Sequence, residues 1–441
     1  MNLSIIVIVN KKGDNMKTIY KMKGYTLHLI PSQKFKTMTV SLRLQSPLTK
    51  ETTTLRTLLT FVLIAATKKY PSTKEISSYL DDNYGARLST NISTKGQSQI
   101  MNIYTSFVNE KFLPQKESLL VHQIQLLNDL FFDPYIQNDA FDETIVLQKK
   151  KELKERLQVN KDDKFSYSLD KLFEYMGHNQ TLGIPSTGYE KDIESITAKD
   201  LYHYLQKCIQ EDEKHLYIVG DIDESVVEIF DKYLKFPENQ HHYTSSYCFK
   251  TQKDEVLEVI EKQDLTQSKL NIGYQIDCDF ISNKHYAMTV FNALFGGFSQ
   301  SRLFKNVREE HSLCYYVSSS YDAFNGIMIV NAGIDAKDYD KARQLIDEQL
   351  HDIQNGHVED EEIQVAKMML QNALRKTNDE AGSMITLLYN RDITGKKETN
   401  DEYIQKLLSV TKEDIIEVSK NIRLDTIFFL TGKEIHENNI L

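Results

Sequence analysis

Two side chains in the C-terminal half of this 441-residue chain have chemistry suited to binding a polar group. Arg308 carries a fixed fork of hydrogen-bond donors, and Tyr315 carries a phenol that donates or accepts a hydrogen bond. An arginine in a surface ion pair and a tyrosine packed at a sheet edge are common, however. Taken by themselves, these two residues therefore favour a structural role.

The stretch that carries both residues, 299–317, predicts a short helix followed by a strand. Leu303, Phe304 and Val307 recur at helical spacing. The residues from Cys314 to Tyr321 are rich in β-formers. We expect the helix to break near His311 and the strand to follow directly.

The composition excludes several classes of function. With 40% hydrophobic and 26% charged residues the chain is an ordinary globular protein. The net charge of −10 and the lack of a basic face argue against binding to nucleic acid. The four cysteines are scattered without a Cys-x-x-Cys pair, which favours a reducing compartment, and we expect a cytoplasmic protein.

The first residues of the sequence are not expected to anchor the chain in a membrane. Its apolar run from Leu3 to Val9 is too short to span a bilayer, and no basic region precedes it. Residues 1–16 are interpreted as an N-terminal extension, either disordered or untranslated if Met16 is the start.

An internal repeat sets the domain organisation. Thr197 stands three residues before Asp200, and Thr411 stands three before Asp414, each time at the expected start of a helix. An apolar strand ending in glycine follows each pair, at Gly220 and Gly432 in turn. This predicts two homologous α+β units, each an antiparallel-rich sheet with helices mainly on one face. We assign 17–235 to the first domain, 236–254 to a solvated linker and 255–441 to the second domain.

A helix predicted over 51–69 would position the first domain's chemistry. Leu55, Leu58, Leu59, Val62 and Leu63 form an apolar stripe at helical spacing. A second helix is expected from Ser72, a candidate N-cap, to about Asn83. Further elements are expected as strands at 89–94, 99–107 and 216–219 and as helices at 112–131, 138–158, 165–176 and 196–209.

Several fragments in this order give the chain a resemblance to the pitrilysin/insulinase family of zinc metallopeptidases. They are Ala66 to Ser72, Tyr84 to Leu88, Gly183 to Pro185, Val219 to Asp223 and Ser301 to Tyr315. The resemblance covers roughly 17–432. It implies a zinc motif His-x-x-Glu-His on the first long helix and a more distant glutamate as third ligand.

The residues at the metal positions cannot bind zinc. Counted back from Ala66, those positions hold Thr57, Thr60 and Phe61. A phenyl ring has no donor atom for a metal, and a threonine hydroxyl is a poor general base. The distal position falls near Glu155 or Arg156, and the more natural alignment gives Arg156. Because no two histidines are four apart, we expect no metal and no cofactor.

The resemblance implies a role for Arg308 and Tyr315 after all. In the family, the matching residues bind substrate or stabilise the transition state. The sequence therefore favours a catalytically inactive subunit that pairs with a zinc-bearing homologue and contributes these two residues to peptide binding. The alternative is a non-enzymatic peptide-binding or scaffold homodimer, accessory to protein modification. A peptidase of another mechanism ranks last, because no Gly-x-Ser-x-Gly elbow occurs and Cys314 fits a packed thiol.

Overall fold

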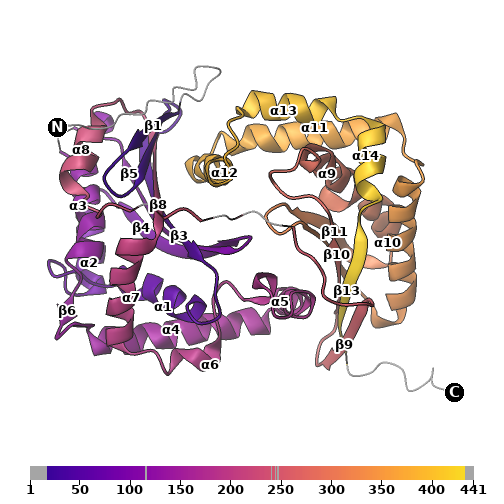
Figure 1. Ribbon diagram of the computed structural model, residues 1–441, viewed down its shortest axis with the longest axis horizontal. Coiled ribbons are helices and arrows are strands. Elements are labelled where there is room, and N and C mark those ends of the chain that lie inside the picture. Colours follow the sequence, from indigo (N-terminus) through magenta and orange to yellow (C-terminus); the bar gives the residue numbers. More distant parts are fainter. Residues whose placement is uncertain (1–16, 115–116, 240, 244, 246–247, 433–441) are drawn as a thin grey trace. The chain divides into compact units, whose positions relative to one another are not determined.

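The computed structural model describes residues 17–114, 117–239, 241–243, 245 and 248–432, which form two compact units (Figure 1). Unit 1 draws its residues from 1–158, 185–244 and 377–399, and unit 2 from 159–184, 245–376 and 400–441. Each unit thus includes one segment from the other half of the sequence. The compact units therefore differ from the consecutive stretches 17–235 and 255–441, which follow the repeat. The expected extension 1–16 lies outside the described residues.

Unit 1 is built on a six-stranded sheet among the described residues. In spatial order its strands are β1 (Thr18–Lys21), β2 (Thr26–Pro31), β8 (Glu213–Gly220), β3 (Thr37–Pro47), β5 (Ser98–Val108) and β4 (Arg87–Lys95). Strands β1 and β2 form an antiparallel hairpin. Strand β8 lies between β2 and β3, parallel to β2 and antiparallel to β3.

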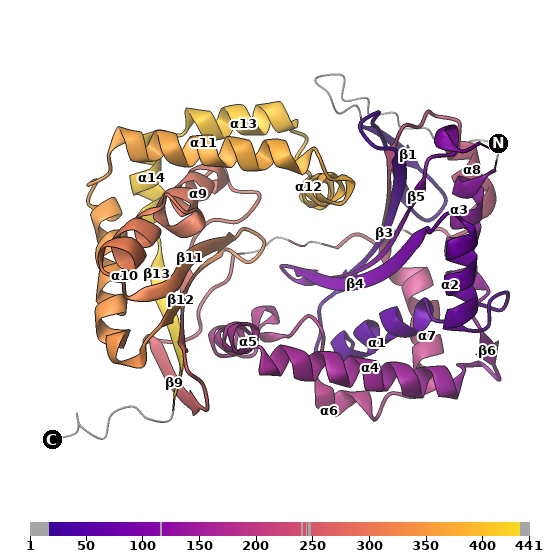
Figure 2. The ribbon, with the colours of Figure 1, turned by 180° about the vertical axis from the view of Figure 1, so that it is seen from behind.

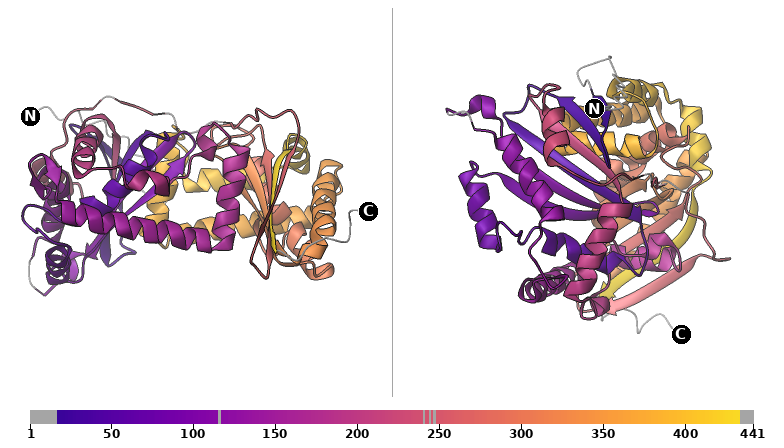
Figure 3. Two further views of the ribbon diagram at one scale, coloured as in Figure 1. Left: turned by 90° about the horizontal axis from the view of Figure 1, so that it is seen from below. Right: turned by 60° about the vertical axis from the view of Figure 1, so that its left-hand side comes forward.

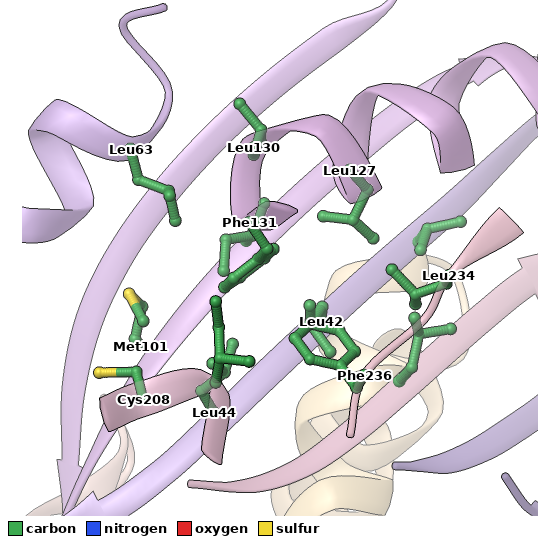
Figure 4. Packing of buried hydrophobic residues seen from close by; sticks show 14 of the residues in the cluster. Leu42, Leu44, Leu63, Met101, Leu127, Leu130, Phe131, Cys208, Leu234 and Phe236 are labelled. Atoms are coloured by element: carbon green, nitrogen blue, oxygen red, sulfur yellow. The ribbon is translucent and has the colours of Figure 1, made fainter. Parts of the chain in front are cut away.

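The helices of unit 1 lie mainly on one face of that sheet. They are α1 (Thr53–Leu63), α2 (Thr73–Asp82), α3 (Leu119–Phe132), the long α4 (Glu143–Asp162; Figure 3), α6 (Glu190–Ile193), α7 (Ala198–Glu211) and α8 (Val226–Tyr233). A small hairpin, β6 (Ile136–Gln137) with β7 (Ala140–Phe141), joins α3 to α4. The core packs strand residues such as Leu42 and Leu44 against Phe131 of α3 and Cys208 of α7 (Figure 4).

The other face of this sheet is covered by α12 (Ala381–Ile393), which comes from the C-terminal half of the chain. Successive strand residues point to opposite faces. Accordingly Ile218 packs in the main core, while its neighbours Tyr217 and Val219 pack against Met384 and Tyr389 of α12.

Unit 2 repeats the plan with a sheet of five strands in the part of the chain that the structure describes. Its spatial order is β11 (Cys314–Asp322), β12 (Ile327–Ile334), β10 (Ser268–Gln275), β13 (Arg423–Gly432) and β9 (Leu257–Gln263). One face carries α9 (His285–Asn292), α10 (Tyr339–Gln354), α11 (Asp360–Thr377), α13 (Asn400–Ser409) and α14 (Lys412–Ser419). The other carries α5 (Lys164–Met176), from the N-terminal half. The predicted fold class, two homologous α+β units with helices mainly on one face, is confirmed.

The repeated helix starts are real capping boxes. The hydroxyl of Thr197 accepts from the backbone N–H of Asp200, whose carboxylate accepts from the N–H of Thr197. Thr411 and Asp414 form the same reciprocal pair at α14. Ser72 likewise caps α2. Each box satisfies backbone donors that a helix start leaves free.

Two local expectations differ from the structure. Helix α1 ends at Leu63 rather than at 69. The backbone N–H of Ala65 donates to the carbonyl of Val62, three residues back, and the N–H of Lys68 donates to the carbonyl of Asp133, so neither continues the helix. In the expected linker 236–254, Phe236 and Phe249 are buried. Among the described residues, no helix is long and apolar enough to cross a membrane.

Candidate functional site

Helix α1, which carries the expected metal positions, is a buried scaffold helix. Leu58, Leu59 and Leu63 on its apolar stripe are inaccessible to solvent. One turn before Leu59 on the same side of the helix, the buried guanidinium of Arg56 pairs with the carboxylate of Asp212 at 2.7 Å. These contacts hold α1 in place without a bound metal.

The threonines at the metal positions are occupied by internal hydrogen bonds. The hydroxyl of Thr57 donates to the carbonyl of Thr53 at 2.9 Å, and the hydroxyl of Thr60 donates to the carbonyl of Thr57 at 2.7 Å. Both residues are almost wholly buried. A neutral hydroxyl that donates to a carbonyl is neither a metal ligand nor a general base.

A loop covers the first turns of α1. The carbonyl of Ser186 accepts from the side-chain amide of Gln99 on β5 at 2.7 Å, and the backbone N–H of Tyr189 donates to the hydroxyl of Thr54 at 2.9 Å. Gly188 has a φ of +82°, and a Cβ there would lie 2.4 Å from the Thr54 hydroxyl oxygen. The sequence contains no signal for these contacts, because they join segments far apart in the chain.

The structure brings Phe61 and Arg156 together. The guanidinium carbon of Arg156 lies 5.7 Å from the centre of the Phe61 ring, within the range of a cation–π interaction. Glu155, the other candidate for the distal position, pairs instead with Lys151 on the same helix. The two positions that would hold metal ligands therefore contain a cation and a ring.

These residues do not fit a zinc ion. Zinc requires imidazole, thiolate or carboxylate donors, and Thr57, Thr60, Phe61 and Arg156 supply none. Across the part of the chain that the structure describes, no cluster of three or more histidine, cysteine or acidic side chains has metal-binding geometry. The emptied site has no chemistry for hydrolysing a peptide bond.

In unit 2, Arg308 lies near the end of a π-helical segment, η4 (Leu303–Glu310). Its side chain is exposed, and its guanidinium carbon lies 4.6 Å from the centre of the Phe304 ring. No ion pair joins Arg308 to another described residue. The surface ion pair that the residue type suggested is thus not formed, and the guanidinium faces solvent.

Tyr315 projects from the edge of the second sheet. The register between β11 and β12 shifts between Cys314 and Tyr316, so Tyr315 stands opposite no residue of β12. Its side chain is 63% exposed, which is unusual for a tyrosine at a strand start. The phenol ring of Tyr315 is therefore exposed to solvent. Among the described residues, no hydrogen bond joins Tyr315 to Arg308.

Cys314 is a buried thiol. Burial raises its pKa to about 12, Asp338 adds to that shift, and the charge of Arg308 opposes it. Since the thiolate is the nucleophile, both the burial and the direction of the pKa shift favour a packed thiol over a catalytic one.

Three comparisons bear on the family. Residues 195–370 match the model of the peptidase M16 inactive domain. The probable inactive metalloprotease YmfF of Bacillus subtilis strain 168 is 37% identical over 418 residues, 94% of this chain and 97% of that protein. A conserved protein from Enterococcus faecalis V583, known from a crystal structure, is 33% identical with a TM-score of 0.88 over 96% of this chain and 100% of its own.

A more distant relative is named an uncharacterized zinc protease, YmxG, also from Bacillus subtilis strain 168. It is 24% identical over 299 residues, 67% of this chain and 70% of that protein. The extended likeness to YmfF, at 37% identity over 94% of this chain, establishes the family. The residues at the metal positions supply no zinc ligand, in keeping with the match to the inactive domain of the family. The chain belongs to the M16, or pitrilysin/insulinase, family of metallopeptidases, as a non-catalytic member without the zinc motif.

Proposed function

We propose that this chain is the non-catalytic subunit of a heteromeric zinc metallopeptidase and offers Arg308 and Tyr315 to peptide bound by its zinc-bearing homologue. One observation carries the proposal. The metal positions are filled by Thr57, Thr60 and Phe61, while the exposed polar groups of Arg308 and Tyr315 form no hydrogen bond or ion pair with the described residues. A fold kept only as scaffold has no need of an exposed phenol at a strand bulge.

The chemistry of the two side chains supports this role. A guanidinium and a phenol both donate hydrogen bonds to a peptide carbonyl or to an oxyanion. The ring of Phe304 beneath Arg308 limits the orientations of the guanidinium, which lowers the entropy lost when it binds.

The relatives of this chain support a zinc-bearing homologue as its partner. One bacterium, Bacillus subtilis strain 168, contains both YmfF, named a probable inactive metalloprotease, and YmxG, named a zinc protease, and both resemble this chain. One cell therefore contains a relative named as inactive and a relative named as a zinc protease, which is the kind of pair that a heteromeric peptidase with one zinc-bearing subunit needs. The four free thiols of this chain fit a reducing cytoplasm, where we place the complex.

The test is reconstitution with a zinc-bearing homologue from the same genome. We expect the two chains to copurify as a complex that cleaves unfolded peptides, while this chain alone does not. Arg308→Ala with Tyr315→Phe should leave assembly intact and lower kcat/KM at least tenfold, by loss of two hydrogen bonds to substrate. Arg375→Ala, an exposed arginine on α11, is the matched control and should leave turnover unchanged.

A second candidate function rests on β4. This strand is the edge of the first sheet and pairs with β5 alone among the described strands (Figure 2). Thr90 of β4 donates to the carbonyl of Thr60, so the free edge runs beside the emptied metal helix. An extended peptide added to β4 would be held there without being cut, as a peptide-binding homodimer accessory to protein modification requires.

The two functions differ in a simple measurement. Stable peptide binding by a homodimer of this chain, with no turnover when a zinc-bearing homologue is added, would favour the second. Peptide turnover that appears only in the mixture, and falls with the Arg308 and Tyr315 changes, would favour the first.

A further inference from the structure

An exposed arginine stands at the distal metal position of unit 1. The side chain of Arg156 on α4 is open to solvent, and its guanidinium contacts the partly exposed ring of Phe61 on α1. Among the described residues, no ion pair or hydrogen bond involves this guanidinium. A ring against one face of a guanidinium leaves the N–H donors around its edge accessible. These donors are therefore available to a ligand from outside the chain.

The acidic side chains nearest to Arg156 along α4 have lysine partners of their own. Glu152, one turn before Arg156, pairs with Lys149 at 2.8 Å. Glu155 pairs with Lys151 at 3.8 Å. Each of these carboxylates thus has a lysine beside it, and neither is bonded to the guanidinium. The positive charge of Arg156 is therefore left to attract an anion that does not belong to this helix.

The free edge of the first sheet lies near this arginine. Strand β4 pairs with β5 alone among the described strands, and an edge strand presents unpaired backbone N–H and C=O groups. Thr90 of β4 donates to the carbonyl of Thr60 at 2.9 Å, and the next residue, Phe61, carries the ring that Arg156 contacts. Helix α1 therefore touches both β4 and the guanidinium of α4 (Figure 2). A template for an extended peptide and a free cation meet at one place on unit 1.

A guanidinium at this position selects a carboxylate over a peptide carbonyl. Its planar fork of N–H groups matches the two oxygens of a carboxylate, and a charge-assisted hydrogen bond is about twice as strong as a neutral one. A peptide that passes this position in mid-chain offers only neutral carbonyl groups. A peptide that ends there offers its terminal carboxylate. The arginine therefore favours the end of a peptide over its middle.

We propose that unit 1 captures the free C-terminus of an extended peptide, which adds to β4 and places its terminal carboxylate on Arg156. Antiparallel pairing is the more stable arrangement, so the peptide runs antiparallel to β4, pairs with residues 91–95 and ends beside Thr90. This inference rests on the peptide binding at β4 that is the second candidate function above. It defines the ligand of that function as a peptide with a free C-terminus, the end that hydrolysis of any peptide bond creates.

Fluorescence anisotropy with the full chain tests the site with three matched probes. Each is a heptapeptide of alternating threonine and valine with fluorescein on its N-terminus: the free acid, the C-terminal amide, and the free acid with methylated backbone nitrogens. We expect the free acid to bind at least tenfold more tightly than the amide, because the amide keeps the strand pairing but loses the charge-assisted contact. The methylated acid should not bind detectably, since it cannot donate hydrogen bonds to the strand edge.

Substitutions on α4 assign the carboxylate contact. Arg156→Gln should lower the affinity for the free acid to that for the amide and leave the amide unchanged, and the fold should persist because the side chain is exposed. Arg156→Lys keeps the charge but not the fork, so it should retain only part of the preference. Lys151→Ala removes a positive charge from the same helix and is the matched control, which should keep the full tenfold preference.

The outcomes separate this proposal from the function on which it rests. Equal binding of the acid and the amide would overturn the carboxylate site and leave peptide addition to β4 standing. Binding of neither peptide by the well-folded chain would overturn both. A preference for the acid that survives Arg156→Gln would overturn the role of Arg156, and tight binding of the methylated acid would overturn the strand pairing. Thermal melting of each variant separates a lost contact from a lost fold.

Discussion

The guanidinium of Arg156 lies over the ring of Phe61, at the two positions where an active relative would hold a metal between α4 and α1. The contact exchanges coordination for a cation–π interaction, worth about 0.5–2 kcal/mol depending on burial. It also places a positive charge where a cation would have to bind. Two changes therefore oppose zinc binding at these positions: the metal ligands are absent, and the positive charge of Arg156 is present.

Restoring the motif on α1 alone should fail to restore the metal site. Thr57→His with Thr60→Glu and Phe61→His recreates His-x-x-Glu-His, but Arg156 then repels zinc and no third ligand is present. Adding Arg156→Glu should produce stoichiometric zinc binding, measured by competition with a chromogenic chelator. Tight one-to-one zinc binding by the triple variant would contradict this interpretation.

The buried pair of Arg56 and Asp212 should be a sensitive point of unit 1. Asp212→Asn leaves the guanidinium without its charge partner in a site closed to solvent. Removing one member of a buried pair destabilises a protein by about 3–5 kcal/mol, whereas an exposed pair contributes less than about 1 kcal/mol. Urea unfolding should therefore show a large effect for Asp212→Asn and little for Lys171→Ala, whose partner Glu174 is on the surface. Similar midpoints for the two variants would refute the expectation.

The folded state of unit 1 should be less stable in mild acid, because of a histidine buried between its sheet and α12. His28 is buried, its ring stacks on Tyr217 at 4.2 Å, and its Nε2 lies 3.1 Å from Nδ1 of His215. Its Nδ1 lies 3.5 Å from Asp392 of α12. Burial lowers the pKa of His28 well below 6.5, and the charges of Lys17 and His215 lower it further.

The sign of the effect follows from proton uptake. Below pH 6.5 the unfolded chain binds a proton at His28 and the folded chain does not, so stability falls as the pH falls, by up to about 1.4 kcal/mol per unit. Urea unfolding at pH 7.5, 6.5 and 5.5 measures this slope. It should be smaller in His28→Gln and unchanged in His203→Gln, an exposed histidine on α7. An equal slope in both variants would assign the acid sensitivity elsewhere.

The range from pH 7.5 to 5.5 lies above the titration of Glu213, a second group of this cluster. Burial alone would raise the pKa of Glu213, but hydrogen bonds with His215, His242 and the backbone N–H of Tyr243 lower it to about 2. The stability that this carboxylate contributes is present above its unfolded pKa and is lost only as the pH falls from about 4.5 towards 2. A loss of stability above pH 5.5 therefore reports mainly on histidine.

The loop that covers α1 should tolerate no side chain at Gly188. Both Gly188 and Gly85 have positive φ, +82° and +68°, so alanine is strained at either position. Only at Gly188 would the new Cβ meet another atom, 2.4 Å away, whereas nothing lies within 4 Å at Gly85. Gly188→Ala should therefore lower the melting temperature by several degrees more than Gly85→Ala. Equal shifts would mean that the loop moves aside freely.

The sequence alone predicts the local features of this protein. Capping boxes at Thr197 and Thr411, the N-cap at Ser72 and the apolar stripe of α1 all follow from spacing within a few residues. Their repetition predicts the duplicated α+β fold. The resemblance to the family assigns positions 57, 60, 61 and 156 to the metal, and the residue types there are enough to exclude a zinc site at those positions.

Only the tertiary structure decided which distant segments meet. It inserts β8 between β2 and β3, places α5 and α12 on the sheets of the opposite halves of the chain, and sets Arg156 over Phe61. It also isolates Tyr315 in a strand bulge. Such pairings depend on surface complementarity between segments far apart in the sequence, for which the periodicity of a single segment carries no information.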